Sequence, residues 1–192
     1  PPQKLVDNKF IVHEDNVQLP RIHLAWHSDK MFGSDDASLD VLSDILSSSK
    51  NSRLQKNLLF DKQIAQDVAA FQYSAKLNGS FIIFATAKPG VTLDAIKKEI
   101  FNEIDNLIEN GITEEELLRA QNSFKSSYIY SLQKLDTVVD HLNHYNYFLS
   151  EPDSFVFDIE RYEKVTVDMV REAARKYLKN HFVELQIIPK SK

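Results

Sequence analysis

The segment that most limits the possible folds is the run FIIFATA at residues 81–87, which is apolar on both of its alternating faces. Phe81 and Ile83 share one face, and Ile82 and Phe84 share the other. A short run rich in β-branched and aromatic residues favours a strand, and two apolar faces are typical of a strand in the middle of a sheet. We therefore expect the chain to build a sheet around this segment.

A second run of the same character, at residues 68–73, lies just before the first. Lys76, Asn78 and Gly79 separate the two runs and suit a hairpin loop. The sequence therefore predicts that residues 68–73 and 81–87 pair as antiparallel strands.

Periodicity and capping residues indicate further strands and helices. We expect strands at 22–27 and 182–188, and helices at 35–46, 51–61, 93–110, 154–163 and 167–178. The strand at 182–188 places Val183, Leu185 and Ile187 on one face and Glu184 and Gln186 on the other. This order of elements favours an α+β fold, in which helices pack on one face of a mostly antiparallel sheet.

The stretch from Thr113 to Leu149 predicts the longest element. Thr113 and Glu116 have the spacing of a capping box, in which each side chain bonds the other residue's backbone N–H. Apolar residues then recur at helical spacing up to Leu149 without an intervening Gly or Pro. We expect one continuous helix of about ten turns.

The chain is expected to hold one domain. Its 192 residues are enough to bury a single core. Residues 1–16 contain prolines and mixed polar residues without an apolar period, so they are expected to be a linker from a preceding domain. Residues 17–192 would then form the domain itself.

Composition excludes several classes of function. A net charge of −5 with scattered basic residues argues against a nucleic-acid partner, because phosphate binding needs clustered Lys and Arg. The chain has no cysteine, which excludes disulfides and thiolate metal sites. No glycine-rich phosphate-binding motif occurs among its four glycines.

Six segments occur in a fixed order and spacing: VQLPRIHLAWH (17–27), DDASLDVLSDIL (35–46), SRLQKNLLFDKQIAQDV (52–68), ATAKPG (85–90), GITEEELLRAQ (111–121) and KVTVDMVREAARKYL (164–178). Together they resemble the second domain of a half-molecule of the bacterial-type M16, or insulinase-like, zinc metallopeptidases. The resemblance extends over nearly the whole chain. It implies the M16 fold and a parent protein that is a zinc metalloendopeptidase.

Zinc ligands in this family lie on an H-x-x-E-H helix, and no such string occurs here. His141 and His144 lie one helical turn apart, but no third ligand or general base accompanies them, so we interpret them as flanking an apolar helix face. His23 and His27 share one face of a strand and are interpreted as part of its polar surface. We expect no metal ligand and no zinc bound by this chain.

Other catalytic groupings are also unsupported. The serines lack the glycine turn that exposes a nucleophile. The acidic runs lie at helix starts, where negative charge is favoured by the helix dipole. These residues are Ser47, Ser48, Ser49, Ser126 and Ser127, and Asp35, Asp36, Asp40, Asp44, Glu114, Glu115 and Glu116.

The resemblance also identifies a second catalytic feature that is absent. In active members, the assisting half carries an Arg and, seven positions on, a Tyr that reach the substrate carbonyl. This chain has Leu59 and Gln66 at those positions. A leucine cannot donate a hydrogen bond to an oxyanion, so we expect this role to be missing.

The resemblance therefore implies a non-catalytic domain that forms part of a closed peptide-degrading chamber. Its partners would be the upstream zinc-binding domain, the other M16 half in the same or a partner chain, and a peptide substrate. The alternative is a degenerate M16-like subunit with a structural or assembly role and no peptidase activity. Analogy with tandem bacterial members favours a periplasmic or other extracytoplasmic location.

Overall fold

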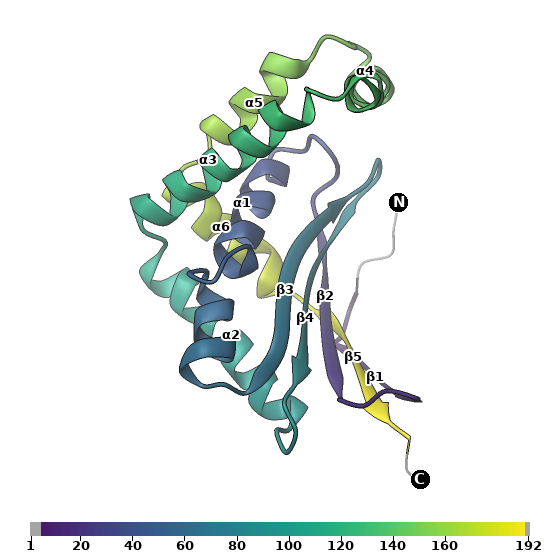
Figure 1. The fold of residues 1–192 in the computed structure, drawn as a ribbon, viewed down its shortest axis with the longest axis vertical. Helices are drawn as coiled ribbons and strands as arrows, with labels where there is room; N and C mark the ends of the chain where they lie inside the picture. Colours follow the sequence, from purple (N-terminus) through teal and green to yellow (C-terminus); the bar gives the residue numbers. More distant parts are fainter. Residues whose placement is uncertain (1–4, 191–192) are drawn as a thin grey trace.

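A five-stranded sheet with helices on one face organises the chain (Figure 1). The structure is a computed structural model and describes residues 5–190. The strand order is β1-β5-β2-β4-β3. The strands are β1 (Lys9–Asp15), β2 (Arg21–Ser28), β3 (Ala65–Ser74), β4 (Gly79–Ala87) and β5 (Phe182–Pro189). The helices are α1 (Asp36–Ser47), the π-helix η1 (Gln55–Asp61), α2 (Leu93–Asn110), α3 (Glu114–Ser131), α4 (Leu135–Leu149), α5 (Phe155–Glu163) and α6 (Val167–Leu178).

The expected α+β architecture is confirmed. Strands β3 and β4 pair antiparallel as the hairpin predicted, with an irregularity between Ala65 and Asp67. Strand β2 lies between β4 and β5 and is antiparallel to both, whereas β1 pairs with β5 in parallel. The sheet is therefore antiparallel except at one edge.

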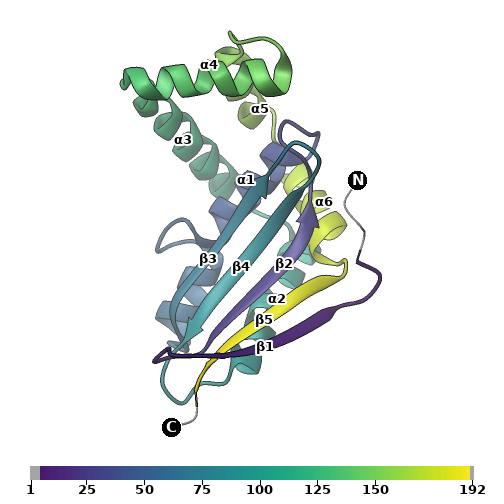
Figure 2. The ribbon, with the colours of Figure 1, turned by 90° about the vertical axis from the view of Figure 1, so that its right-hand side faces the viewer.

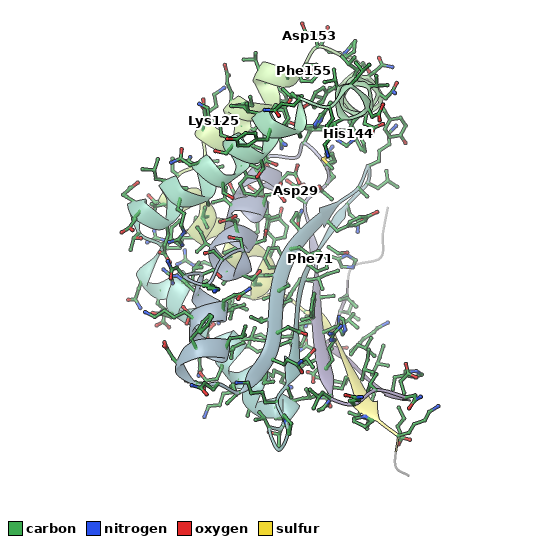
Figure 3. The ribbon with its side chains drawn as sticks, viewed as in Figure 1. Asp29, Phe71, Lys125, His144, Asp153 and Phe155 are labelled. Carbon is green, nitrogen blue, oxygen red and sulfur yellow. The ribbon has the colours of Figure 1, made fainter. Side chains whose placement is uncertain are left out.

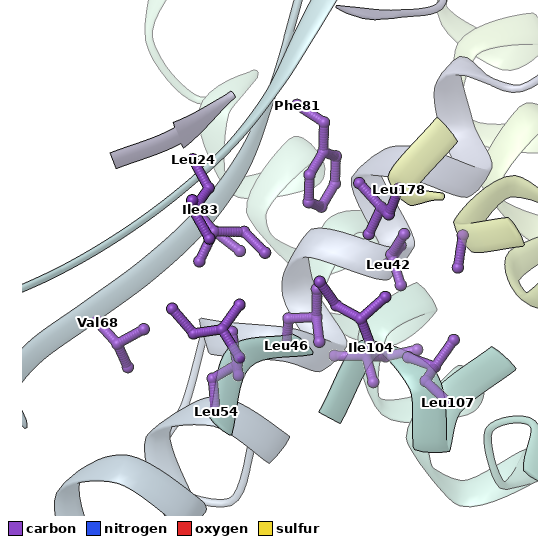
Figure 4. Close-up of a cluster of buried hydrophobic side chains, with 14 of the residues drawn as sticks. Leu24, Leu42, Leu46, Leu54, Val68, Phe81, Ile83, Ile104, Leu107 and Leu178 are labelled. Carbon is purple, nitrogen blue, oxygen red and sulfur yellow. The ribbon is translucent and has the colours of Figure 1, made fainter. Parts of the chain in front are cut away.

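The core lies between the helices and the face of the sheet that they cover. Leu42 and Leu46 of α1 meet Leu24 and Ile83 of the sheet there, and all four side chains are fully buried (Figure 4). Removing a leucine side chain from such a site costs about 2–5 kcal/mol. Because α1 also contacts α3, α5 and α6, it holds the helical layer against the sheet.

Strand β5 turns its polar face toward the helices. Glu184 lies opposite Leu24 in the sheet, so both side chains point into the covered face. The Glu184 carboxylate is buried and accepts a hydrogen bond of 2.9 Å from Nζ of Lys97 on α2. Phe182 shares this face and packs against Trp26 in the core, whereas Val183 and Leu185 face the other side of the sheet.

The expectation that residues 1–16 form a linker is wrong for part of this segment, because Lys9–Asp15 forms β1. All residues of this strand are exposed, so buried and exposed positions do not alternate along it. Its partner is β5, with Lys9 opposite Val183 and Asp15 opposite Pro189. The chain thus adds an edge strand to the sheet where the sequence predicted no regular structure.

The single long helix expected from Thr113 to Leu149 is also wrong. Helix α3 ends at Ser131, and α4 begins at Leu135 after a tight turn. The turn folds α4 back so that the hydroxyls of Tyr128 and Tyr145 lie 2.6 Å apart. In a continuous helix these two residues would be roughly 25 Å apart along the axis, so the break is what allows this contact.

Arg53 attaches η1 to the junction between α2 and α3. Its guanidinium donates to both carboxylate oxygens of Glu116, at 2.7 and 2.9 Å, and to the carbonyl of Gly111 at 3.0 Å. The predicted capping box of Thr113 and Glu116 is confirmed, so the same carboxylate also accepts from the Thr113 backbone N–H. One carboxylate therefore both caps α3 and attaches a distant helix.

Ser47 blocks the β3 edge of the sheet near its middle. The Ser47 hydroxyl accepts a hydrogen bond of 2.6 Å from the Ala70 backbone N–H and donates one of 3.2 Å to the Ala70 carbonyl. These two groups would otherwise be open to another strand. Ser47 therefore has a structural role in a buried position.

We expect Ser47→Ala to lower the free energy of unfolding by about 1–3 kcal/mol, because it leaves a buried N–H and carbonyl without partners. Urea unfolding followed by circular dichroism measures this change. Ser126→Ala is the matched control, since Ser126 is exposed and should change stability by less than about 0.5 kcal/mol. Equal effects of the two variants would contradict the assigned role of Ser47.

Acid should weaken the Arg53–Glu116 attachment. Burial acts to raise the pKa of Glu116, but the hydrogen bonds and charge of Arg53, with those from Thr113, outweigh it and lower the pKa from 4.5 to about 2. The ionised carboxylate therefore stabilises the fold above pH 4.5, and this contribution is lost as the pH falls from 4.5 toward 2. We expect Glu116→Gln to lower stability at neutral pH by about 2 kcal/mol and to flatten the acid limb of a stability–pH curve measured by urea unfolding. An unchanged acid limb in the variant would refute this assignment.

Candidate functional surface

No helix or strand of residues 5–190 covers the face of the sheet opposite the helices (Figure 2). We call this face the open face. Much of this face is apolar, although apolar residues of a monomer's sheet are usually covered. Register and alternation place the following residues on it: Ile11, His23, Ala25, Ala69, Phe71, Tyr73, Ile82, Phe84, Val183, Leu185 and Ile187. The open face is therefore a candidate surface for contact with another part of a protein.

Phe84 of β4 lies at the centre of an aromatic cluster on the open face. Phe71 of β3 contacts it edge to face, with the ring centroids 6.3 Å apart, and Phe71 remains 39% exposed (Figure 3). The Arg21 guanidinium lies over the Phe84 ring at 5.1 Å from its centroid. The cluster thus presents a ring and a cation together, a combination enriched at protein interfaces.

The two strand histidines, His23 and His27, both lie on the open face. The His23 ring packs against Phe84, and burial, together with the charge of Arg21, lowers the pKa of His23. Nδ1 of His27 lies 3.3 Å from the side-chain nitrogen of Asn78 in the hairpin loop. Each ring therefore has a neighbour that explains its position.

Leu59 and Gln66, at the positions of the family's Arg and Tyr, are separated by a sharp turn. The Leu59 side chain packs against the core from η1, whereas Gln66 is exposed at the irregular start of β3. Gln66 lines a shallow pocket of about 340 Å³ together with Arg21 and Asp67, which are joined by a 3.3 Å ion pair. The two side chains thus do not form a pair of hydrogen-bond donors directed at one point.

His141 and His144 lie on α4 and both contact Tyr145, but otherwise pack against different aromatic rings. His141 packs between Tyr128 and Tyr145, and its Nε2 lies 3.4 Å from the Ser131 hydroxyl. His144 faces the loop before α1, where burial lowers its pKa (Figure 3). Within residues 5–190, no group of three or more His, Cys, Asp or Glu side chains has the geometry to hold a metal ion.

The sequence did not indicate a buried polar cluster that attaches α5 to α1. Arg161 of α5 donates to Asp36 at 3.0 Å and to Asp158 at 2.7 Å, and the Asp36 side chain is only 1% exposed. Beside it, the Tyr162 hydroxyl donates to Asp40 at 2.7 Å. Asp36 and Asp40 lie one turn apart on the same side of α1. Their spacing, together with the adjacent Arg161 and Tyr162 on α5, was the only sequence signal of this cluster.

Asp40 makes stability depend on pH in the direction opposite to Glu116. Burial, reinforced by the charge of Asp36, raises the pKa of Asp40 from 3.8 to about 7. The protonated form therefore stabilises the fold, and this contribution is present below pH 3.8 and lost as the pH rises toward 7.

We expect Asp40→Asn to remove the decrease in unfolding free energy between about pH 4 and pH 7, because the amide is neutral throughout and still accepts from Tyr162. Urea unfolding at a series of pH values gives the slope. Asp7→Asn, at an exposed carboxylate, is the control and should leave the slope unchanged. A slope that persists in Asp40→Asn would show that another group titrates.

No helix in the described part of the chain is both long and apolar enough to span a membrane.

The chain shares sequence with a curated bacterial zinc protease. It is 28% identical over 128 residues to the zinc protease PqqE of Helicobacter pylori, an alignment that covers 67% of this chain and 29% of that protein. The aligned part therefore spans less than a third of the relative's length.

Solved structures show the same fold. A protease from Helicobacter pylori superposes with a TM-score of 0.89 at 21% identity, over 97% of this chain and 45% of that one. A peptidase M16 inactive domain from Pseudomonas fluorescens superposes with a TM-score of 0.82 at 19% identity, over 96% of this chain and 44% of that one. The family profile described as the peptidase M16 inactive domain matches residues 1–124. The chain therefore belongs to the peptidase M16 inactive-domain family.

Proposed function

We propose that this chain is the non-catalytic domain of a zinc-dependent endopeptidase and forms one wall of the chamber in which peptides are hydrolysed. The active site would lie in an upstream domain that carries the zinc ligands and the general base. Membership of the inactive-domain family supports a non-catalytic role for this domain and a catalytic role for the upstream domain. The observation that carries the proposal is the apolar open face.

The open face has the properties of a contact surface within a larger assembly. It spans the sheet from β1 to β3, and its centre is the Phe71–Phe84 pair with Arg21 above it. Covering a phenylalanine side chain fully gains about 1.5–3 kcal/mol, so an uncovered group of such residues favours a partner. We assign this partner to the upstream zinc-binding domain, which would use the open face to fix its position.

The chain's own residues fit a scaffold better than a site of chemistry. The serines, acidic residues and histidines considered above are buried in structural contacts, exposed singly, or paired with neighbours. Leu59 packs inward, so the position that carries the Arg in active members offers no donor to a substrate carbonyl. In this proposal, hydrolysis needs groups from another domain or half.

We expect Phe71→Glu, made in the longer protein, to lower peptide hydrolysis at least about tenfold while leaving the zinc content unchanged, because it introduces a charge into the contact. Hydrolysis of an unstructured peptide and atomic absorption measure the two quantities. Ile129→Glu is the matched control, since Ile129 is 50% exposed on α3 and lies away from the open face.

Equal activity of the two variants would show that the open face makes no functional contact. A longer protein with no H-x-x-E-H motif upstream, or one that holds zinc and hydrolyses no peptide, would contradict the peptidase proposal. That result would favour the alternative of an assembly subunit.

A further inference from the structure

The two edges of the sheet are treated differently by the fold. At the β3 edge, Ser47 occupies the backbone N–H and carbonyl of Ala70, and α1 packs against the strand. At the other edge, β1 pairs with β5 on one side and with no strand of residues 5–190 on its other side. One edge is therefore closed and the other is open.

The open edge carries charged residues at its ends, Lys9, Glu14 and Asp15, but its middle lacks a bulge and a proline, which are two features that prevent strands from associating. Its register with β5 is unbroken from Lys9 to Asp15, so no bulge twists it away. It contains no proline, and its middle residues are apolar and exposed: Phe10 by 64%, Ile11 by 49% and Val12 by 62%. A regular, exposed, apolar edge strand is a template for pairing with another strand.

The end charges of β1, KFIVHED, are complementary when two copies run antiparallel. With Val12 opposite Val12, Lys9 lies across from Asp15 of the second copy, Phe10 across from Glu14, and Ile11 across from His13. A parallel arrangement in the same register would instead place Lys9 against Lys9 and Asp15 against Asp15. Charge therefore favours the antiparallel pair, which has the two-fold symmetry common in homodimers.

We propose that two copies of this chain associate through their β1 edges, antiparallel about a two-fold axis at Val12, and so join two five-stranded sheets into one. Backbone hydrogen bonds between the strands hold the pair, and the two Lys9–Asp15 contacts set its register. The contact differs from the one in the proposed peptidase role, because it uses the backbone groups of a sheet edge, although Ile11 of β1 also lies on the open face.

The test measures self-association by sedimentation velocity from micromolar to near-millimolar protein. We expect a reversible monomer–dimer equilibrium. Val12→Lys should weaken it at least about hundredfold, because two like charges then meet at the axis and apolar contact is lost. Tyr73→Lys is the matched control, since it places the same charge on the closed β3 edge, and it should leave the equilibrium unchanged.

A charge exchange tests the register. Lys9→Glu and Asp15→Lys should each weaken the dimer about tenfold, since each creates two like-charge contacts. The double variant Lys9→Glu/Asp15→Lys should return the dissociation constant to within about threefold of the original, because it restores opposite charges across the axis. If circular dichroism shows that Val12→Lys has unfolded, these charge variants still test whether the dimer forms through β1.

Three results would overturn the proposal. The chain could remain monomeric throughout the concentration range. A dimer could form that a folded Val12→Lys variant leaves intact, which would place the contact elsewhere. The two charge changes could be additive in the double variant, which would exclude Lys9 and Asp15 as facing residues.

Discussion

The structure depends on a sheet that is apolar on both faces but has helices on only one of them. Ile22, Leu24 and Trp26 of β2 are buried beneath the helical layer, while the alternate residues of the neighbouring strands face outward. Helix α1 is central to the covered side because it contacts β3, α3, α5 and α6. The fold is thus complete on one face of the sheet and suited to further contact on the other.

Buried ion pairs attach the outer elements to this core. Arg53 joins η1 to the start of α3, Lys97 joins α2 to β5, and Arg161 joins α5 to α1. In each pair the carboxylate is largely buried and belongs to a distant part of the sequence. Breaking one partner of such a pair is costly because the other charge remains in the interior. These pairs therefore specify where each element docks more than they add to stability.

Local rules predicted the elements whose signals are local. The hairpin loop, the cap at Thr113 and the period of α2 each lie within a few residues of their effect. The break after Ser131 could not be predicted, because no Gly or Pro marks it and the contact of Tyr128 with Tyr145 that accompanies it is tertiary. Strand β1 was missed because a fully exposed edge strand has no buried face to produce alternation.

The candidate surface was only partly predictable for a related reason. Alternation in β5 showed that Val183 and Leu185 share a face, but not that Glu184 would point toward the helices. That choice is decided by Lys97, which lies 87 residues away in the sequence. The positions of Leu59 and Gln66 followed from the resemblance, whereas the burial of Asp36 beneath Arg161 required the tertiary structure.

The contacts of Glu116 affect local unfolding at the start of α3. Its carboxylate accepts from the Thr113 backbone N–H, the Thr113 hydroxyl and two guanidinium nitrogens of Arg53. The first turn of α3 therefore cannot fray without also releasing η1, although 63 residues separate the two partners. Helix ends usually exchange their amide hydrogens independently of the rest of a protein. In this molecule the start of α3 is coupled to the η1 segment, so local opening of one weakens the attachment of the other.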